Sequence, residues 1–286
     1  MGNDPVFPPE RVTLVGVLNV TPDSFSDGGR LLTDSGRVSM DRVLSAAQAL
    51  VDSGTHVLDV GGESTRPGAV AVSVEEETER TVGVVEQLVR EFDVPVSIDS
   101  RKGPVVRLAL EAGARVVNDI SGLTHDSSVA SAAADADAYL VIGHIRGTPE
   151  TMQDAPHYGD VLEEVASELE SSVACARAEG VPTSRLVVDP GIGFGKRVED
   201  NLELIAHAGW LRDRLGLPVM VGASRKAFLG AVTGDPVGSR DTASHAACAV
   251  AAFAGADAVR VHDAEGARRA VAVGRAMAAV RRKDLS

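Results

Sequence analysis

The chain has 286 residues, of which 44% are hydrophobic, so it can bury a substantial core in one or two domains. Its 41 acidic side chains outnumber the 28 basic ones, which gives a formal net charge of −13, and aromatic residues make up only 3%. These values argue against a nucleic-acid-binding protein, which would usually carry a basic surface and aromatic stacking platforms. The basic run at 281–283 fits a solvated helix end.

The cysteines and the N-terminal segment favour an intracellular setting. Cys175 and Cys248 are too few for a disulfide framework and stand in no metal-type spacing. The N-terminal segment lacks the apolar centre of a secretory signal, and Val6 stands where a myristoylation signal needs Ser or Thr. No run approaches the roughly 18 apolar residues that a membrane span requires. We therefore expect a cytoplasmic protein with neither a membrane nor a nucleic-acid partner.

In chain order, short apolar runs alternate with longer amphipathic ones. Runs that are rich in Val and Ile, without polar alternation, are typical of strands buried on both faces. They are predicted at 12–18, 56–60, 94–98, 115–117, 138–142, 185–188, 218–221 and 258–261. Helical patterns lie between them, for example at 37–53, 74–92, 158–179 and 241–254. Glycines suited to helix C-caps stand at 54, 113, 180 and 255.

Strand–helix units of this number and length predict an α/β fold, a single (β/α)8 barrel. It would form one domain over 1–286, after a short irregular segment at 1–11. The alternative is a doubly wound open sheet, which normally has fewer strands and often a nucleotide loop after the first strand. We find no linker or low-complexity segment that would divide the chain.

The segment RLVVDPGIGFGK at 185–196 is rich in glycine without being a nucleotide-binding loop. Pro190 and Arg197 occupy positions that a phosphate loop reserves for Gly and for Ser or Thr. The glycines at 191, 193 and 195 also lack the spacing of a dinucleotide fingerprint. We expect Asp189 to end the sixth strand and the glycines to let the backbone turn tightly beside a site.

Polar or charged residues follow every predicted strand. A single Asp in such a place is usually a helix N-cap, but the strand ends of a barrel meet at one rim, where its chemistry collects. We therefore predict a shared site at this rim. The residues are Asn19, Asp59 and 61–66, Asp99, Asn118 and Asp119, His144 and Arg146, Asp189, 224–226, Arg260, and His262 with Asp263.

Basic side chains are concentrated after the second, seventh and eighth strands. Barrels commonly bind phosphate after strands seven and eight, and guanidinium and ammonium groups suit a phosphate or diphosphate. The alternative is that Arg225 or Arg260 only pairs with a neighbouring carboxylate such as Asp263. The basic set is Arg66, Arg225, Lys226, Arg260 and His262.

The opposite side of the rim offers Asp99, Asn118 and Asp189, with no basic residue close in sequence. An amide can donate and accept, and a carboxylate can accept two N–H groups side by side. Such a set suits a flat heterocycle rich in N–H donors and ring acceptors. The competing interpretation is a Mg²⁺ site with three oxygen ligands.

Longer motifs occur in a fixed order: GVLNVTPDSFSDGG (16–29), DVGGESTRPGA (59–69), SIDS (97–100), VNDISG (117–122), GTPETMQ (147–153), DPGIGFGK (189–196), SRKAFLG (224–230) and RVHD (260–263). They resemble the dihydropteroate synthase family over nearly the whole chain. The resemblance implies condensation of 6-hydroxymethyl-7,8-dihydropterin diphosphate with para-aminobenzoate, giving 7,8-dihydropteroate and diphosphate. It further implies Mg²⁺ as cofactor, a homodimer, and a sulfonamide target or a resistant form of one, because sulfonamides imitate para-aminobenzoate.

The resemblance also implies residue roles. Asn19 would coordinate Mg²⁺, and the pterin ring would be bound by Asp99, Asn118 and Asp189, with Lys226 over it. The diphosphate would be held by Thr65, Arg66, Arg260 and His262, and the para-aminobenzoate pocket would be shaped by Pro67, Phe194, Ser224 and Arg225. Val261 completes the substrate-binding set. The catalytic residues would be Asp99, Asp189, Lys226 and Arg260, and the loops 21–32 and 64–71 would close over a dissociative reaction.

One stretch departs from the family, and two other functions stay open. The family usually has L-M-H-M-R-G after the fifth strand, whereas this chain has VIGHIRG, so Gly143 and Ile145 predict a repacked pocket floor. A methyltetrahydrofolate-type methyltransferase uses a similar barrel but would not need the first-loop motif or the SRK cluster. A non-catalytic pterin- or phosphate-binding protein should have lost some of the site residues.

Overall fold

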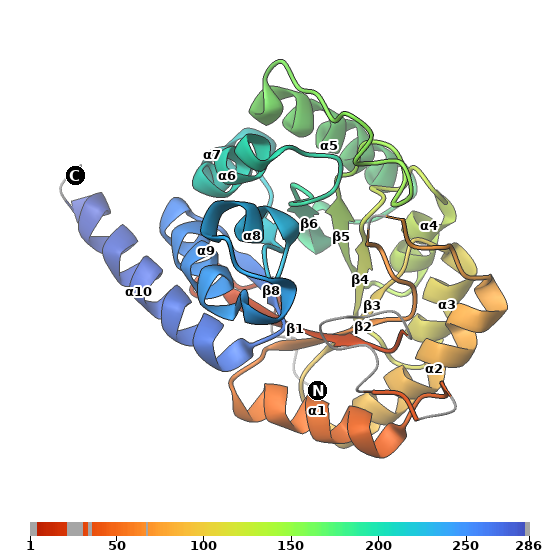
Figure 1. The fold of residues 1–286 in the computed structure, drawn as a ribbon. Coiled ribbons are helices and arrows are strands. Elements are labelled where there is room, and N and C mark those ends of the chain that lie inside the picture. The colour runs from red at the N-terminus through yellow and green to blue at the C-terminus, as the bar shows by residue number, and fades with distance from the viewer. Residues whose placement is uncertain (1–4, 22–30, 34–35, 67, 284–286) are drawn as a thin grey trace.

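The computed structural model describes residues 5–21, 31–33, 36–66 and 68–283 and contains a parallel sheet of eight strands (Figure 1). The hydrogen-bonded order is β6-β5-β4-β3-β2-β1-β8-β7. The strands are β1 (Thr13–Asn19), β2 (Val57–Gly61), β3 (Val96–Asp99), β4 (Val116–Asp119), β5 (Tyr139–Gly143), β6 (Leu186–Asp189), β7 (Met220–Val221) and β8 (Ala258–Val261).

The two ends of this sheet meet. Val188 of β6 forms a parallel bridge with Val219, and its backbone N–H donates to the Pro218 carbonyl at 2.9 Å. This pairing brings β6 beside β7 and nearly closes the sheet into a barrel. The predicted (β/α)8 fold, the TIM barrel, is therefore confirmed, and the open doubly wound sheet is excluded.

Helices surround the barrel and connect its strands (Figure 1). None of the helices in the described part of the chain is long and apolar enough to cross a membrane. Short 3-10 turns at Thr183–Arg185 and Val237–Ser239 accompany them in the described part of the chain. The α-helices are α1 (Met40–Asp52), α2 (Val74–Glu91), α3 (Gly103–Glu111), α4 (Ser128–Asp135), α5 (Val161–Ala178), α6 (Val198–Ala206), α7 (Ala208–Leu215), α8 (Ala227–Thr233), α9 (Asp241–Ala254) and α10 (Ala264–Lys283).

All strands except β8 begin one or two residues later than the predicted apolar runs, and several include the polar residue that follows. Val94 and Pro95 precede β3 because proline has no N–H for the ladder, although its carbonyl accepts from Leu58 at 3.0 Å. Arg185 belongs to a 3-10 turn before β6. Helix α9 has the predicted bounds, and Gly255 ends it with φ 105°, a left-handed conformation that glycine adopts readily.

The N-terminal end of the barrel is filled by apolar side chains. Val6 and Phe7 have no regular structure, but both are buried against inward residues of the strands such as Val15. The Phe7 ring packs edge-on against Tyr139, with centroids 5.5 Å apart. Because this end is filled by its own core, polar side chains are left to the opposite end.

Strand alternation and register select the polar side chains that face inward at that opposite end. In a parallel sheet, residues in register present their side chains to the same face. Asn19 pairs with Gly61, Gly61 with Asp99, and Asp99 with Asn118. Gly61 keeps this row open, because a Cβ there would lie only 3.1 Å from Asn19 Oδ1. The register thus assembles the predicted rim.

Candidate active site

A pocket opens at the carboxyl ends of the strands. It collects Asp99, Asn118, Asp189 and Lys226 with eight other residues, so most of the pterin-side prediction lies on one surface. Residues from loops after β2, β6 and β7 complete the wall. The lining residues are Thr65, Asp99, Asn118, Ile120, Gly143, Asp189, Gly191, Ile192, Phe194, Gly222, Lys226 and Arg260.

Arg260 lies among the carboxylates rather than apart from them. Its Nε donates to Asp59 Oδ2 at 2.6 Å, and an Nη donates to Asp99 Oδ2 at 2.7 Å. Asn118 Nδ2 donates to the same Asp59 oxygen at 3.3 Å. The sequence suggested a basic half of the rim opposite an acidic half, and Arg260 breaks that division. Its partners are not Asp263, the neighbour considered from sequence.

Asp59 belongs to the predicted rim, but the sequence analysis gave it no role in the site. Its side chain is fully buried beneath Arg260, and Oδ1 has no hydrogen-bond partner among the described residues. Its position two residues before Gly61 places it on the same inward face of β2. Strand alternation could therefore have assigned it to the interior of the site.

Burial brings several ionisable groups of the pocket toward neutrality. It raises the pKa of Asp99 to about 7, although Arg260 acts in the opposite direction. Burial also raises the pKa of Asp189, whose Oδ1 accepts from the Gly191 N–H at 2.7 Å. The same effect lowers the pKa of Lys226 to about 8, against the attraction of Asp189. The pocket therefore holds poorly solvated groups that a polar ligand can stabilise.

Lys226 and Phe194 form one wall of the pocket. The Lys226 Nζ lies 3.8 Å from the centroid of the Phe194 ring, which is a close cation–π contact. Gly193 permits this packing, since a Cβ at that position would lie 2.9 Å from Lys226 Cδ. The predicted tight turn after β6 is present, with φ of 68°, 82° and 65° at the glycines 191, 193 and 195.

The structure corrects the expected charge of His262. Burial, together with Arg225 and Arg260, lowers the pKa of His262 to about 3, so the imidazole is neutral. Its Nδ1 lies 3.0 Å from Ser224 Oγ, and it can serve a ligand as a hydrogen-bonding group rather than as a cation. Arg225 pairs with Asp241, Nε to Oδ1 at 2.6 Å, so the ion-pair alternative holds for it with another partner.

Other predicted positions lie away from the pocket or cannot be placed. Val261 is buried in the core between sheet and helices, and it is not among the lining residues. Asp119 accepts backbone N–H groups of Ser121 and Leu123 at 2.8 and 2.7 Å, which is a capping role. Pro67 and residues 22–30 of the first loop lie outside the described residues.

The loop after β2 is fastened at both ends by one carboxylate. Glu63 precedes the loop and accepts from the backbone N–H of Val72, which follows it, at 3.1 Å. The same carboxylate binds Arg101 Nε at 3.0 Å and Lys102 Nζ at 3.1 Å. These two cations follow β3, so Glu63 ties the loop that carries Thr65 to the segment that follows Asp99.

Gly143 forms part of the pocket floor, where the backbone of the next corner comes close. A Cβ at this position would lie 2.6 Å from Ile120 Cα and 2.9 Å from the Asp119 carbonyl oxygen. Both are backbone atoms, so a longer side chain requires the β4–α4 corner to move. At Gly143 the pocket floor is therefore packed by the backbone of the β4–α4 corner instead of by a long side chain, which is how the predicted repacking occurs.

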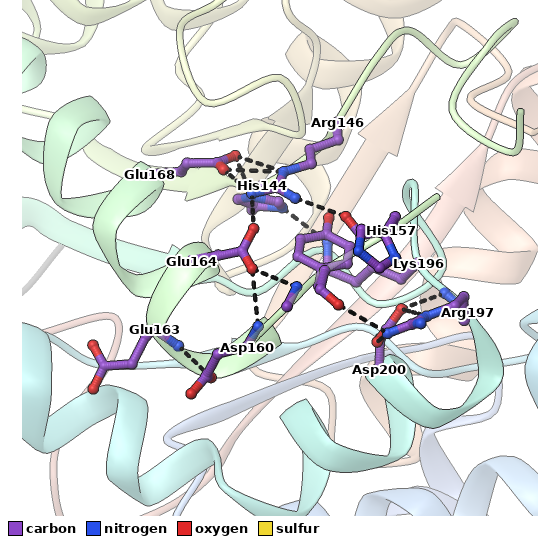
Figure 2. Close-up of polar contacts among 12 residues, drawn as sticks. His144, Arg146, His157, Asp160, Glu163, Glu164, Glu168, Lys196, Arg197 and Asp200 are labelled. Carbon is purple, nitrogen blue, oxygen red and sulfur yellow. Dashed lines mark hydrogen bonds and ion pairs between the residues drawn. The ribbon is translucent and has the colours of Figure 1, made fainter. Parts of the chain in front are cut away.

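His144 and Arg146 form a polar network behind the pocket wall instead of lining it (Figure 2). Lys196 Nζ lies 2.8 Å from His144 Nδ1, and His144 Nε2 lies 2.9 Å from Glu168 Oε2. Arg146 binds Glu168 and also Glu164, at 2.7 Å. No sequence pattern distinguishes Glu168, because it lies within the amphipathic pattern of α5.

Comparisons with known proteins place this pocket in a class. The sequence profile described as "Pterin binding enzyme" matches residues 15–262. The dihydropteroate synthase of Synechocystis is 43% identical over 257 residues, which cover 90% of this chain and 86% of that protein. The barrel and the pocket thus define a pterin-binding enzyme.

Solved structures agree with the sequence comparison. The Yersinia pestis dihydropteroate synthase, solved with a sulfonamide drug complex, has a TM-score of 0.89 at 37% identity and covers 95% of this chain and 96% of that chain. The Xanthomonas albilineans enzyme with 4-aminobenzoic acid has a TM-score of 0.83 at 41% identity, covering 93% of each chain. The chain belongs to the dihydropteroate synthase family and is a transferase.

Proposed function

We propose that the pocket binds 6-hydroxymethyl-7,8-dihydropterin diphosphate with its ring between Asp99, Asn118 and Asp189. The observation that carries this assignment is the convergence of these three side chains on one surface, from β3, β4 and β6. Their amide and carboxyl groups match the donors and acceptors on the edge of a pterin. Lys226 covers one side of the ring.

The diphosphate belongs to the side of the pocket formed after β2, β7 and β8. Thr65 lines the pocket there, and Arg66 follows it on the same loop. Ser224 and the neutral His262 supply hydrogen bonds, while Arg260 supplies charge at the boundary with the pterin site. A diphosphate in this place would be bound by a small number of cationic side chains and several uncharged hydrogen-bond donors.

The residues at this rim fit Mg²⁺, which Asn19 would help to hold. Asn19 is half-buried and faces inward, and its Oδ1 lies beside Gly61. Among the described residues no group of three or more His, Cys, Asp or Glu side chains could hold a metal, so those residues by themselves form no protein cage for it. Mg²⁺ commonly takes one or two protein oxygens plus phosphate and water, and it would neutralise charge on the leaving diphosphate.

The reaction breaks the bond between the pterin methylene carbon and the diphosphate oxygen. The amine of para-aminobenzoate then forms a carbon–nitrogen bond and loses a proton to solvent, while diphosphate leaves. If the methylene carbon becomes cationic first, Asp189 is suited to stabilise it. A carboxylate whose pKa is raised by burial gains more from an arriving cation than a well-solvated one does.

The same pocket offers a place for the arylamine beside Phe194. The resemblance assigns this second substrate to Phe194, Ser224, Arg225 and Pro67. The complexes of the Yersinia pestis enzyme with a sulfonamide drug and of the Xanthomonas albilineans enzyme with 4-aminobenzoic acid support para-aminobenzoate as the second substrate. We expect sulfonamides to compete with para-aminobenzoate here.

A homodimer would cover an exposed apolar face on α9 and α10. Val273, Met277 and Val280 recur at helical spacing on α10, and Val250 of the adjacent α9 is also exposed. Contiguous apolar patches of this kind mark association surfaces. Sedimentation of the wild type as a dimer and of Met277→Glu as a monomer would support this assembly, whereas a monomeric wild type would contradict it.

Cytoplasmic localisation completes the proposal. Cys175 and Cys248 are free thiols, as a reducing compartment would keep them. Fractionation of the source cells tests it, and recovery of the protein outside the cytoplasm would contradict it.

Two measurements test the function. Diphosphate release from the pure protein with both substrates and Mg²⁺ tests the overall reaction. Calorimetric titration of diphosphate, with and without Mg²⁺, tests the metal site at Asn19, for which we expect tighter binding with the metal. Equal affinity in the two titrations would remove the proposed role of Asn19 without affecting the reaction assignment.

A further inference from the structure

The loop from Asp189 to Lys196 is rich in glycine, and glycine by itself imposes little backbone conformation. Three of its glycines have positive φ, and two of them rest directly on the backbone after β5. A Cβ on Gly191 would lie 1.7 Å from the His144 carbonyl oxygen, and one on Gly195 would lie 2.6 Å from the Arg146 carbonyl oxygen. The loop therefore lies flat on the segment 144–146 and needs polar contacts to fix it there.

Lys196 provides such contacts from inside the protein. It is 3% exposed, and its Nζ lies 3.1 Å from the Phe194 carbonyl oxygen and 2.8 Å from His144 Nδ1. Glu168, on the far side of the imidazole, lies 2.9 Å from His144 Nε2. Figure 2 shows these three side chains close together, each from a separate segment.

The direction of these hydrogen bonds follows from the charge of Lys196. Burial lowers the pKa of Lys196 to about 7, and below that pH its Nζ is an ammonium group, which only donates. His144 Nδ1 then accepts, and His144 Nε2–H donates to the Glu168 carboxylate. Burial and Lys196 lower the pKa of His144 to about 4, in agreement with a neutral imidazole. In this form the Lys196 ammonium is joined through a neutral ring to a carboxylate whose side chain is 43% exposed.

None of these three side chains lines the pocket. Lys196, at one end of this series of hydrogen bonds, nevertheless contacts the carbonyl oxygen of Phe194, which does line it. We propose that Lys196, supported by His144 and Glu168, is a positioning residue that fixes Phe194 and thereby the para-aminobenzoate half of the site. This proposal rests on the reaction and the pocket assignment given above. Asp99 and Asn118 are held by β3 and β4, so the pterin half has its own support.

Steady-state kinetics of Lys196→Met test the proposal. We expect the KM for para-aminobenzoate to rise on the order of tenfold or more, the scale of a small misplacement of a site residue. The KM for the pterin diphosphate should stay within about twofold of the wild-type value, because the contacts that bind this substrate are unchanged. Arg185→Met is the matched control: it breaks a bidentate pair with Asp137 just before β6, away from the pocket, and should change neither KM.

Two further variants make the test specific to the chain of contacts. The double variant His144→Leu/Lys196→Met should raise the KM for para-aminobenzoate no more than Lys196→Met alone does, because both substitutions interrupt the same series of hydrogen bonds. His144→Asn keeps an acceptor for Lys196. It should therefore retain most of the affinity for para-aminobenzoate that His144→Leu loses. Should Lys196→Met fold poorly, Glu168→Gln must shift the same KM in the same direction by a smaller factor.

Equal increases in both KM values, additive effects in the double variant, or no change in Glu168→Gln would overturn the proposal. A wild type that releases no diphosphate would contradict the proposed function instead, so the two failures can be told apart.

Discussion

Arg260 and Asp99 stand 161 residues apart in the sequence and meet inside the barrel, with 2.7 Å between a guanidinium nitrogen and Asp99 Oδ2. The same guanidinium binds the fully buried Asp59 at 2.6 Å. One side chain of β8 therefore balances two carboxylates of β2 and β3. Its planar fork suits this task, which a lysine with a single ammonium would not perform equally well.

Arg260→Met should destabilise the protein most strongly at high pH. Removing one partner of a buried ion pair costs about 3–5 kcal/mol, because the remaining charge is left uncompensated. The pKa of Asp99 is already raised to about 7, so its protonated form favours the folded state. The stability that this group contributes is complete below its unfolded pKa of about 4 and is lost as the pH rises through 7.

Urea unfolding of wild type and Arg260→Met at pH 5 and pH 8 provides the measurement. We expect the free energy of unfolding of Arg260→Met to fall less below that of the wild type at pH 5, where Asp99 can take up a proton, than at pH 8. Arg185→Met, which interrupts an ion pair with the exposed Asp137, serves as the control. A deficit of the same size at both pH values would show that Asp99 does not titrate in this range.

Gly143→Ala should weaken both folding and pterin binding. The added Cβ would lie 2.6 Å from Ile120 Cα, and insertion of one methyl group into a tight site typically costs about 1–3 kcal/mol. Because Ile120 lines the pocket, its displacement should also reduce the affinity for the pterin. Thermal unfolding and pterin titration measure the two effects.

Gly83→Ala is the matched control for this substitution. Gly83 lies within α2 and a Cβ there would meet nothing within 4 Å, so alanine should stabilise the helix by about 0.5–1 kcal/mol. Full stability and unchanged pterin affinity in Gly143→Ala would mean that the β4–α4 corner moves freely. The sequence departure at Gly143 would then have no consequence for the pocket.

Strand periodicity made the barrel and much of the rim predictable. The eight runs of Val and Ile identified the strands, and the polar residue that closes each run marked the rim. Asp99, Asn118 and Asp189 follow directly from this reasoning, because each occupies an inward position at the end of its strand. Asp59 was also part of the predicted rim, and the same alternation would have placed its side chain inside the barrel beneath the site.

Contacts between distant segments were not predictable in this way. The pairing of Arg260 with Asp99 depends on side chains crossing the barrel interior, and the link from Lys196 to Glu168 depends on how α5 lies against two loops. The neutrality of His262 follows from burial, which a sequence does not state. The fit at Gly143 depends on backbone distances that only the folded barrel defines.

Glu63→Gln should reduce the coupling between the two substrates. We expect para-aminobenzoate to bind the wild type poorly until diphosphate and Mg²⁺ have ordered the loop at 64–71, which positive coupling between ligands requires. Burial acts against ionisation of Glu63, but Arg101 and Lys102 hold its pKa below the usual value. Glutamine keeps an acceptor for the Val72 N–H but loses the charge that faces the two cations.

Para-aminobenzoate titrations, with and without diphosphate and Mg²⁺, measure this coupling. The gain in affinity from the first ligand should be smaller in Glu63→Gln than in the wild type, by a factor of about 5 or more, which is within the usual range of coupling energies. Glu86→Gln, at an exposed ion pair on α2, is the control. Equal affinities with and without diphosphate in the wild type would contradict the ordered-loop mechanism itself.

Asp189→Asn should impair pterin binding with little effect on folding. Oδ1 of Asp189 already accepts from the Gly191 N–H, so an asparagine keeps that bond through its carbonyl oxygen. Its NH₂ group then replaces Oδ2, and a donor meets the N–H edge of the pterin where an acceptor is needed. Loss of a charged partner of this kind costs about 1.5–3 kcal/mol of binding free energy.

Folding should be unaffected or slightly favoured in this variant above pH 5. Burial raises the pKa of Asp189, so the ionised form opposes the folded state, and an uncharged amide removes that opposition. Calorimetry with the pterin diphosphate and thermal unfolding separate the two effects. An Asp189→Asn protein that binds the pterin and turns over like the wild type would place the pterin edge elsewhere in the pocket. A loss of stability together with binding would instead assign Asp189 to the turn at Gly191 rather than to the substrate.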